Sequence, residues 1–332
     1  MKKLPALVTA AVLLLGAAGC AQHKASAASP DSANADLKGV VLKVGDQKAG
    51  AKPLLAAAGL LDGTAYTIQW SNFTSGPPLL EAANAGAIDL GGVGDAPPIF
   101  AASGGSKITI VAATRSAPNG SAILIPKDSP ITTLAQLKGK KVAVAKGSSS
   151  NAHLLNALAS VGLSFADITP AYLQPADALA AFSRGSVDAW AIWDPYTALA
   201  QQSTGAKILV DGSGGLLSGL SFTVAASSSL RDPKKVRAIR DFVGRLARAR
   251  EWTRSHHDAW AATWAKEAGI PLAVAKLAVE RADQHSVVID DAVVAAEQKT
   301  ADVFLAAQLI PNKVDINAIT DREFNDAVPA AS

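Results

Sequence analysis

The chain has 332 residues, of which 49% are hydrophobic and 18% are charged, enough for a substantial core and for two domains rather than one. The formal net charge is only +3, and Lys2 and Lys3 lie at the extreme N-terminus, so nucleic acid or an acidic polymer is not an expected partner. Cys20 is the only cysteine, which excludes a disulfide, a cysteine-based zinc site and a catalytic thiol from the folded body.

The first twenty residues are typical of an export signal. A basic start is followed by an apolar stretch, Leu4 to Leu15, that is too short to span a bilayer comfortably, and small residues then precede Cys20. This pattern resembles a bacterial lipoprotein signal, with an ordinary secretory signal as the alternative. We expect residues 1–20 to be the signal peptide, Cys20 to be lipidated, and residues 21–37 to be a flexible tether. The protein would then be extracytoplasmic and lipid-anchored to the bacterial cell membrane.

Beyond the tether, short apolar runs alternate with segments of helical periodicity. Most of these runs lack the alternation of a half-exposed strand, as expected of parallel strands covered on both faces. Strands are predicted at residues 40–45, 66–73, 87–93, 107–113, 121–126, 141–145, 170–174, 187–193 and 220–226. Helices are predicted after Ser75 and after Ser149.

From about residue 232 onward the pattern is almost wholly helical. An apolar stripe recurs at Val236, Ile239, Val243 and Leu246. The arginines of the same segment are Arg240, Arg245, Arg248 and Arg250. They lie mostly off the stripe, so we expect a solvated face rather than a nucleic-acid-binding helix.

A weak internal repeat predicts two lobes of similar build. Residues 86–89, Gly-Ala-Ile-Asp, are followed by Asp95, and about 100 residues later residues 185–188, Gly-Ser-Val-Asp, are followed by Asp194. Glycine suits the residue after a helix because it accepts a left-handed conformation, and the next residues read as a strand. The alternative is a chance similarity between residues that are common at helix–strand junctions.

Several predicted helices start with residues that suit a small oxyanion. In an open parallel sheet, ligands bind outside the carboxyl ends of the strands, where the next helix starts with unpaired N–H groups and a partial positive charge. Ser148, Ser149 and Ser150 add hydroxyl donors at one such point, and Gly147 permits close approach of the backbone. The equivalent positions hold Ser75 and Gly76, then Gly94, Asp95 and Ala96, then Trp190, Trp193 and Asp194. Each alone is more typical of capping or core packing, whereas together they indicate a ligand site.

No catalytic or metal motif is present in the sequence. Residues 211–215, Asp-Gly-Ser-Gly-Gly, have the wrong order for a nucleophile elbow, and Lys-Gly-Ser-Ser at 146–149 lacks the spacing of a phosphate loop. The histidines show no metal-ligand spacing, and His256 and His257 are adjacent, so a helix cannot put them on one face. We therefore expect no enzyme, no cofactor and no bound metal.

Five segments of the chain resemble the substrate-binding proteins of aliphatic sulfonate ABC importers. They are GDQKAGAKPLL, GAIDLGGVGDAPPIFA, SPITTLAQLKGKKVAVAKGSSSNAHLLNAL, LQPADALAAFSRGSVDAWAIWDPY and TADVFLAAQLIPNKVDI, between about residues 40 and 316. The resemblance implies an α/β, two-lobe periplasmic-binding-protein type II fold with two crossover strands and a helical C-terminal region. It also implies a discontinuous first lobe, residues 38–118 and 222–332, and a second lobe, residues 119–221.

The resemblance further implies a function in transport for sulfur acquisition. An alkanesulfonate would bind in the cleft at the residues named above together with Gln47, and an ABC permease with its ATPase would receive it. We expect a monomer that binds no nucleic acid. Asp46 and Asn151 depart from the family, which commonly has Tyr and His there, and Asp46 favours a ligand with an amine. Taurine, nitrate, sulfate esters and a thiamin precursor therefore remain alternative ligands, and related pyrimidine-forming enzymes depend on cysteines and histidines that this chain lacks.

Overall fold

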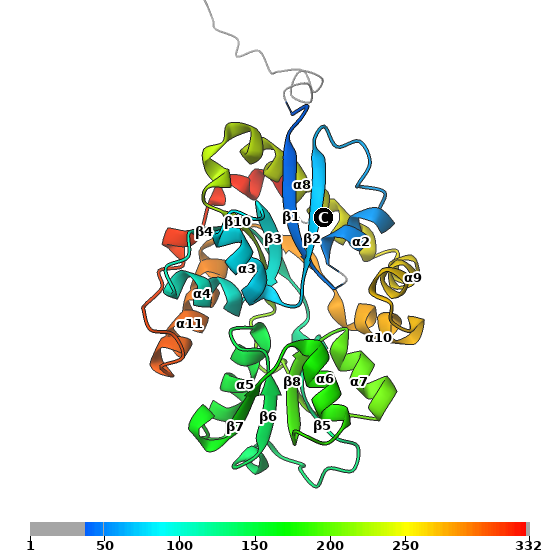
Figure 1. Cartoon of the computed structure of the whole chain (residues 1–332), viewed down its shortest axis with the longest axis vertical. Coiled ribbons are helices and arrows are strands. Elements are labelled where there is room, and N and C mark those ends of the chain that lie inside the picture. The colour runs from blue at the N-terminus through cyan, green and yellow to red at the C-terminus, as the bar shows by residue number, and fades with distance from the viewer. Residues whose placement is uncertain (1–36, 49, 330–332) are drawn as a thin grey trace, which may run out of the picture.

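The computed structural model describes residues 37–48 and 50–329. The predicted signal peptide, the lipidation site Cys20 and residues 21–36 of the tether lie outside the described residues. Two sheets, each covered by helices, form two lobes that lie one above the other in Figure 1. Within the described ranges, no helix combines the length and the apolar character needed to cross a bilayer.

The first lobe contains a six-stranded sheet in the order β11-β4-β10-β3-β1-β2. Its strands are β1 (Val41–Gln47), β2 (Thr67–Phe73), β3 (Leu90–Gly94), β4 (Ile108–Arg115), β10 (Leu220–Ala226) and β11 (His285–Val287). Its helices are α2 (Ala51–Ala57), α3 (Gly76–Asn84), α4 (Ala96–Ser103), α8 (Pro233–Thr253), α9 (His257–Ala268), α10 (Leu272–Ala282) and α11 (Asp291–Ala306).

The second lobe contains a five-stranded sheet in the order β7-β6-β8-β5-β9. Its strands are β5 (Ser121–Ile125), β6 (Lys141–Val144), β7 (Thr169–Tyr172), β8 (Ala189–Trp193) and β9 (Lys207–Asp211). Helices α5 (Ser149–Ala159), α6 (Pro175–Ser183) and α7 (Tyr196–Thr204) cover it. Apolar clusters lie on both faces of this sheet, which explains why its strands carry no clean alternation.

The chain crosses between the lobes twice. Residues 116–120 connect β4 to β5, and residues 212–219 connect β9 back to β10. We call these two stretches the crossing segments. Each segment leads from one sheet directly into the other. The first sheet therefore contains strands that precede the second lobe in sequence, β1 to β4, and strands that follow it, β10 and β11.

The nine predicted strands are present, but the structure differs from the expectations in two respects. Two further strands, β9 and β11, were not predicted: β9 lies at the edge of its sheet, and β11 has only three residues. The expectation of parallel strands was only partly right. β5 runs antiparallel to both its neighbours, β8 and β9, and β10 runs antiparallel to β3 and β4, because each of these strands follows a crossing segment.

The internal repeat corresponds to a hydrogen-bond pattern that both lobes share. Asp89 Oδ2 accepts a bond from Lys43 N at 2.7 Å, and Asp188 Oδ2 accepts the equivalent bond from Lys141 N at 2.8 Å. In both lobes a glycine closes the preceding helix with positive φ, 71° at Gly86 and 68° at Gly185. The repeated aspartate therefore ties the start of one strand to the start of its parallel neighbour in each lobe.

Candidate ligand-binding site

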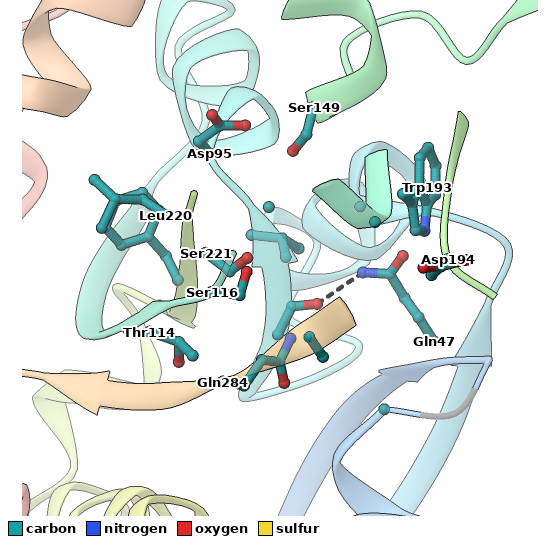
Figure 2. A pocket seen from close by; sticks show the side chains of 18 of the residues that line it. Gln47, Asp95, Thr114, Ser116, Ser149, Trp193, Asp194, Leu220, Ser221 and Gln284 are labelled. Atoms are coloured by element: carbon teal, nitrogen blue, oxygen red, sulfur yellow. Dashed lines mark hydrogen bonds between the residues drawn. The ribbon is translucent and has the colours of Figure 1, made fainter. Parts of the chain in front are cut away.

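A cavity of about 320 Å³ lies between the two lobes (Figure 2). Its walls come from the ends of β1, β3 and β8, the starts of α3 and α5, and both crossing segments, while α8, α9 and α10 close its inner end. The volume falls near the lower end of the range of about 300–1,000 Å³ that is usual for small-molecule sites. The cavity lies outside the carboxyl ends of parallel strands, where such folds bind ligands.

Most of the predicted contact residues line this cavity. They are Gln47, Gly76, Gly94, Asp95, Ser148, Ser149, Trp193 and Asp194. Gln47 is held at the end of β1 because its Nε2 donates to the carbonyl of Gly92 at 2.8 Å, and this bond is drawn in Figure 2. The predicted strand ends and helix starts therefore lie at the cavity, and their contact with a ligand stays a prediction.

Trp190 was predicted to face the ligand, but its side chain is fully buried in the core of the second lobe. Its ring centroid lies 5.8 Å from that of Phe182 and 6.1 Å from that of Tyr196. Trp193 lies three residues further along β8 and therefore points to the opposite side of the strand. Of these two tryptophans, Trp193 lines the cavity and Trp190 does not.

Ser75 and Ala96 also lie outside the cavity lining, because both are fully buried behind it. The Ser75 hydroxyl donates to Gln174 Oε1 of the second lobe at 2.9 Å, and the Thr74 hydroxyl donates to the same oxygen at 3.0 Å. Ser75 therefore joins the two lobes. Ala96 instead gives its backbone N–H to the Asp95 carboxylate.

Gly147 and Ser150 lie at the start of α5 but outside the cavity lining. Gly147 adopts a φ of 73°, and a side chain there would press against the ring of Phe100 in the first lobe. Its N–H donates to Asn151 Oδ1 at 3.0 Å. The Ser150 hydroxyl is buried without a hydrogen-bond partner among the described residues. Neither residue lines the cavity.

Three helix starts around the cavity are occupied by carboxylates of the chain itself. Asp46 accepts bonds from the backbone N–H groups of Ala51 at 2.8 Å and Lys52 at 2.9 Å, which caps α2. Asp95 accepts from the first N–H of α4 at 2.8 Å. Asp194 accepts from the N–H of Ala198, in α7, at 2.9 Å. These helix starts are therefore not available to an external anion.

The same three carboxylates set the electrostatics of the cavity wall. Burial raises the pKa of Asp46, Asp95 and Asp194, and backbone N–H donors offset part of this rise at each. For Asp194 the positive charge of Arg281 lowers the pKa more than any other neighbour. Where these carboxylates are ionised, they disfavour a ligand with two negative charges near any of them. Asp46 lines the cavity while it accepts bonds from the backbone N–H groups of α2, and its preference for a ligand with an amine stays a prediction.

Helices α3 and α5 lack a side-chain cap. The Ser148 hydroxyl, at the N-cap of α5, donates to the carbonyl of Ala145 at 2.7 Å instead. Pro77 and Pro78 have no N–H, so α3 offers fewer donors than α5. The start of α5 is thus the stronger place for an anion, and Ser148 and Ser149 bring it to the cavity.

Ser149 also forms a contact between the lobes. Its hydroxyl lies against Gly94, so closely that a Cβ at Gly94 would collide with it. The hydroxyl also forms a hydrogen bond with the Asp95 carboxylate, which receives a further bond from Ser218 at 3.2 Å. Figure 2 shows Ser149 and Asp95 on opposite sides of the gap between the lobes. The predicted hydroxyl donor is therefore already engaged, which leaves backbone N–H groups for a ligand.

Sequence reasoning missed the polar residues of and beside the crossing segments. Thr114, Ser116, Ser121 and Ser221 line the cavity, as does Gln284 before β11. Ser116 and Ser221 lie next to each other in Figure 2, which agrees with the pairing of β4 and β10. Ser121 and Ser221 belong to predicted strands and none of the five follows a predicted strand end at a helix start, so no local pattern marks these side chains as cavity-facing.

Arg250 was expected on a solvated face, but it lines the cavity. It stands four residues after Leu246, so it continues the apolar stripe of α8, and this signal could have identified it. The two lysines nearest the site in sequence do not line it. Lys48 lies over the ring of Tyr196, 5.9 Å from its centroid, and Lys146 lies over that of Tyr172 at 5.7 Å.

The cavity has no sign of a metal centre in the part of the chain that the structure describes. There, no three His, Cys, Asp or Glu side chains come together closely enough to hold a metal ion. The chemistry available at the cavity is hydrogen bonding by hydroxyl, amide and backbone donors, one guanidinium, and apolar contact with aromatic rings.

Comparison with known proteins gives consistent matches. The model of the NMT1-like family matches residues 47–268. An aliphatic sulfonates-binding protein of Escherichia coli (strain K12) is 42% identical over 279 residues, which cover 83% of this chain and 86% of the relative. The crystal structure of the alkanesulfonate-binding protein SsuA from Xanthomonas axonopodis pv. citri, bound to MOPS, has a TM-score of 0.79 and 36% identity, covering 86% of this chain and 99% of that one. The periplasmic SsuA of Escherichia coli has a TM-score of 0.73 and 40% identity, with 84% and 91% covered.

A more distant structure shares the fold alone. The desulfurization enzyme DszB has a TM-score of 0.62 at 17% identity, covering 86% of this chain and 98% of that one. The two-lobe fold thus carries both binding proteins and an enzyme, while the relatives of high identity are binding proteins. With a family match over most of its length and such relatives, the chain belongs to the NMT1-like family and, within it, to the aliphatic sulfonate-binding proteins.

Proposed function

We propose that this protein captures an alkanesulfonate between its two lobes and delivers it to the permease of an ABC importer. The observation that carries the proposal is the uncapped start of α5, which faces Gly94 across the cavity while carboxylates occupy the starts of α2, α4 and α7. The site would thus offer neutral backbone donors to one small anion. The relatives bear the name of sulfonate-binding proteins, which supports the same ligand class.

A sulfonate suits these surroundings better than a phosphate does. It carries one negative charge at all pH values near neutrality, so a few neutral donors and the partial charge of a helix start can balance it. A phosphate dianion would meet the carboxylates of Asp46, Asp95 and Asp194 at the same cavity wall. Nitrate is also a monoanion, but it has no organic part to fill the apolar inner end of the cavity.

Capture would proceed by closure of the lobes over the ligand. Contacts that join the lobes are Thr74 and Ser75 with Gln174, Ser149 with Asp95, and Arg281 with Asp194. An apolar cluster of α4, α5 and α11 adds buried contact beside them. The crossing segments would act as the hinge, since they alone connect the two sheets. A lipid anchor at Cys20 would keep the loaded protein beside its permease.

Isothermal titration calorimetry of the mature protein tests the ligand class. The panel consists of ethanesulfonate, butane-1-sulfonate, taurine, nitrate, sulfate and a thiamin precursor. We expect the two alkanesulfonates to bind and to produce compaction in small-angle X-ray scattering. Binding of nitrate or the thiamin precursor without either sulfonate would overturn the proposal.

A further inference from the structure

The inner end of the cavity differs in character from the end at α5. Phe242 and Leu246 of α8 and Trp260 and Trp264 of α9 form its walls. The two tryptophan rings stack with centroids 5.4 Å apart and planes inclined by 9°. This compartment lies between the first sheet and the C-terminal helices. It suits an organic group rather than a hydrated ion.

Two polar groups in this apolar compartment lack a partner among the described residues. They are Arg250 Nε and Trp264 Nε1, both buried. The guanidinium donates one long bond, from Nη1 to the Ser286 hydroxyl at 3.3 Å, and no described carboxylate forms an ion pair with it. A buried donor without an acceptor is unfavourable, and a buried unpaired charge is more so.

Other arginines of the same helix show what a structural role looks like. Arg245 donates to the carboxylate of Asp241 at 2.6 Å and to the carbonyls of Leu60, Asp62 and Gly63 at 2.9–3.0 Å. Arg240 binds Asp326 and the carbonyl of Glu323. Arg250 forms no comparable set of bonds. It therefore does not serve to fasten α8 to its neighbours.

The surroundings of Arg250 are hollow rather than packed. A second cavity of about 30 Å³ adjoins the first, and Arg250, Leu54, Trp260 and Gln284 line both. Burial lowers the pKa of Arg250 to about 10, so the guanidinium remains protonated at neutral pH. Among the described side chains that line the main cavity, Arg250 is the single cation. A fixed positive charge thus faces the space that a ligand would fill.

We propose that this inner end is a second anion subsite, where Arg250 and Trp264 Nε1 bind a carboxylate or second sulfonate at the far end of the ligand. The preferred ligands would then be sulfonates with two acidic groups, joined by an aliphatic or aromatic spacer that packs against Phe242 and Trp260. This inference rests on the proposed function, because it assigns the first sulfonate to the start of α5. A second acidic group would give Arg250 the counter-charge that the protein does not supply.

A simple alkanesulfonate would fit this arrangement less well. Its hydrocarbon tail would displace water from Arg250 and Trp264 Nε1 and offer no acceptor in return. Sites built to hydrogen-bond a ligand group discriminate strongly against an analogue that lacks it, because their own donors are left unpaired. The second acidic group should therefore increase affinity although it adds a negative charge.

Matched ligand pairs test the subsite by calorimetry. The aliphatic pair is pentane-1-sulfonate and 5-sulfopentanoate, and the aromatic pair is benzenesulfonate and 4-sulfobenzoate. We expect the wild-type protein to prefer the diacid of at least one pair by about 10- to 100-fold, the range for hydrogen bonds to charged groups. The affinity for the diacid divided by that for its monoacid partner should fall to about 1 in Arg250→Met. Arg250→Lys should restore part of this ratio. Trp264→Phe keeps the ring but removes the N–H, and should reduce the ratio about 3- to 10-fold.

Arg248→Met is the matched control, because Arg248 lies on the same helix and is exposed. It should keep the wild-type ratio. If the wild-type protein binds both members of each pair equally, or if Arg250→Met weakens both members by one factor, the second subsite is wrong while the proposed function stands. If no sulfonate of either kind binds, the proposed function itself fails. Circular dichroism of each variant confirms that it folds.

Discussion

Arg281 of α10 and Asp194 at the end of β8 form an ion pair between the lobes, with 3.5 Å from Nη1 to Oδ2. Both side chains are mostly buried, with 14% and 10% of their surface exposed. Arg281 also donates from Nη2 to Gln201 Oε1 of the second lobe at 2.6 Å. Asp194 in turn caps α7. The pair therefore links the C-terminal helices of the first lobe to the ligand-facing edge of the second.

Replacing Arg281 with methionine should weaken ligand binding by favouring separated lobes. The change removes the cation from a buried carboxylate, and residues in direct contact commonly couple by about 0.5–3 kcal/mol. We expect the sulfonate affinity to fall about 10-fold and the radius of gyration of the ligand-free protein to increase. Arg322→Met is the control, since Arg322 pairs with exposed Asp291 in the first lobe only. Unchanged affinity and size for Arg281→Met would contradict this role.

Gly94→Ala should impair binding without unfolding the protein. The new Cβ would collide with the Ser149 hydroxyl of the other lobe, so the lobes could not approach as closely. We expect a loss of at least 10-fold in sulfonate affinity, measured by calorimetry. Gly104→Ala is the control, because its Cβ would meet only ordinary contacts near the end of α4. The double variant Gly94→Ala, Ser149→Ala should bind better than Gly94→Ala alone, and the opposite order would rule out the collision.

Glu297→Gln should stabilise the protein at neutral pH. Glu297 is fully buried in α11, and neither carboxyl oxygen has a partner among the described residues. Burial raises the pKa of Glu297 well above its ordinary value, and the charge of Asp95 raises it further. The folded protein therefore binds a proton that the unfolded chain releases above its ordinary pKa of about 4.3, so stability falls as the pH rises past that value. Glutamine avoids this penalty.

Urea denaturation measures the effect of Glu297→Gln. The gain in free energy of unfolding should be larger at pH 7 than at pH 5, because the wild-type penalty shrinks as the unfolded chain approaches its own pKa. The exposed Glu251→Gln serves as the control. A gain of equal size at both pH values would mean that titration of Glu297 is not its cause.

His153 should make the protein sensitive to mild acid. It is fully buried in α5, and its Nε2 donates to the carbonyl of Asp211 at 3.0 Å. Burial lowers the pKa of His153 to about 4, whereas an unfolded histidine titrates near 6.5. The unfolded chain therefore binds a proton first as the pH falls. The buried, neutral His153 makes its full contribution to stability above about pH 6.5. As the pH falls from about 6.5 to about 4, this contribution of up to about 3 kcal/mol is lost.

His153→Gln isolates this contribution because glutamine does not titrate. The loss of unfolding free energy between pH 7 and pH 4.5 should be smaller in the variant than in the wild-type protein. His257→Gln, at an exposed position, should leave the wild-type pH profile unchanged. An unaltered profile in His153→Gln would assign the acid sensitivity to other groups.

The sequence predicted those parts of the fold that depend on neighbours in the chain. Asp89 and Asp188 follow positive-φ glycines at fixed spacing, and both make the same bond to a neighbouring strand. The direction of a strand relative to a partner far away in sequence could not be predicted in this way. The antiparallel course of β10 depends on the return of the chain through residues 212–219, which no local pattern records.

The same distinction between local features and contacts distant in sequence applies to the candidate site. Helix starts at Gly76 and Ser149 could be predicted, because capping residues and strand ends are local features. The strand period of two also allows only one of Trp190 and Trp193 to face the cavity, although the uniformly buried strand hides which one. Arg250 was assigned to solvent because the stripe was followed only as far as Leu246. A charge at the next position of that stripe was the available signal.

The crossing segments carry Ser116, Gly120, Leu217 and Gly219 to the cavity wall. If the lobes pivot about these stretches, the residues that bend also line the space that a ligand would fill. Opening would then require the bound molecule to lose contacts on both pivots in the same step. Changes in these two stretches should therefore alter the dissociation rate of the ligand more than its association rate. A docked permease that strains the two stretches would thereby control release directly.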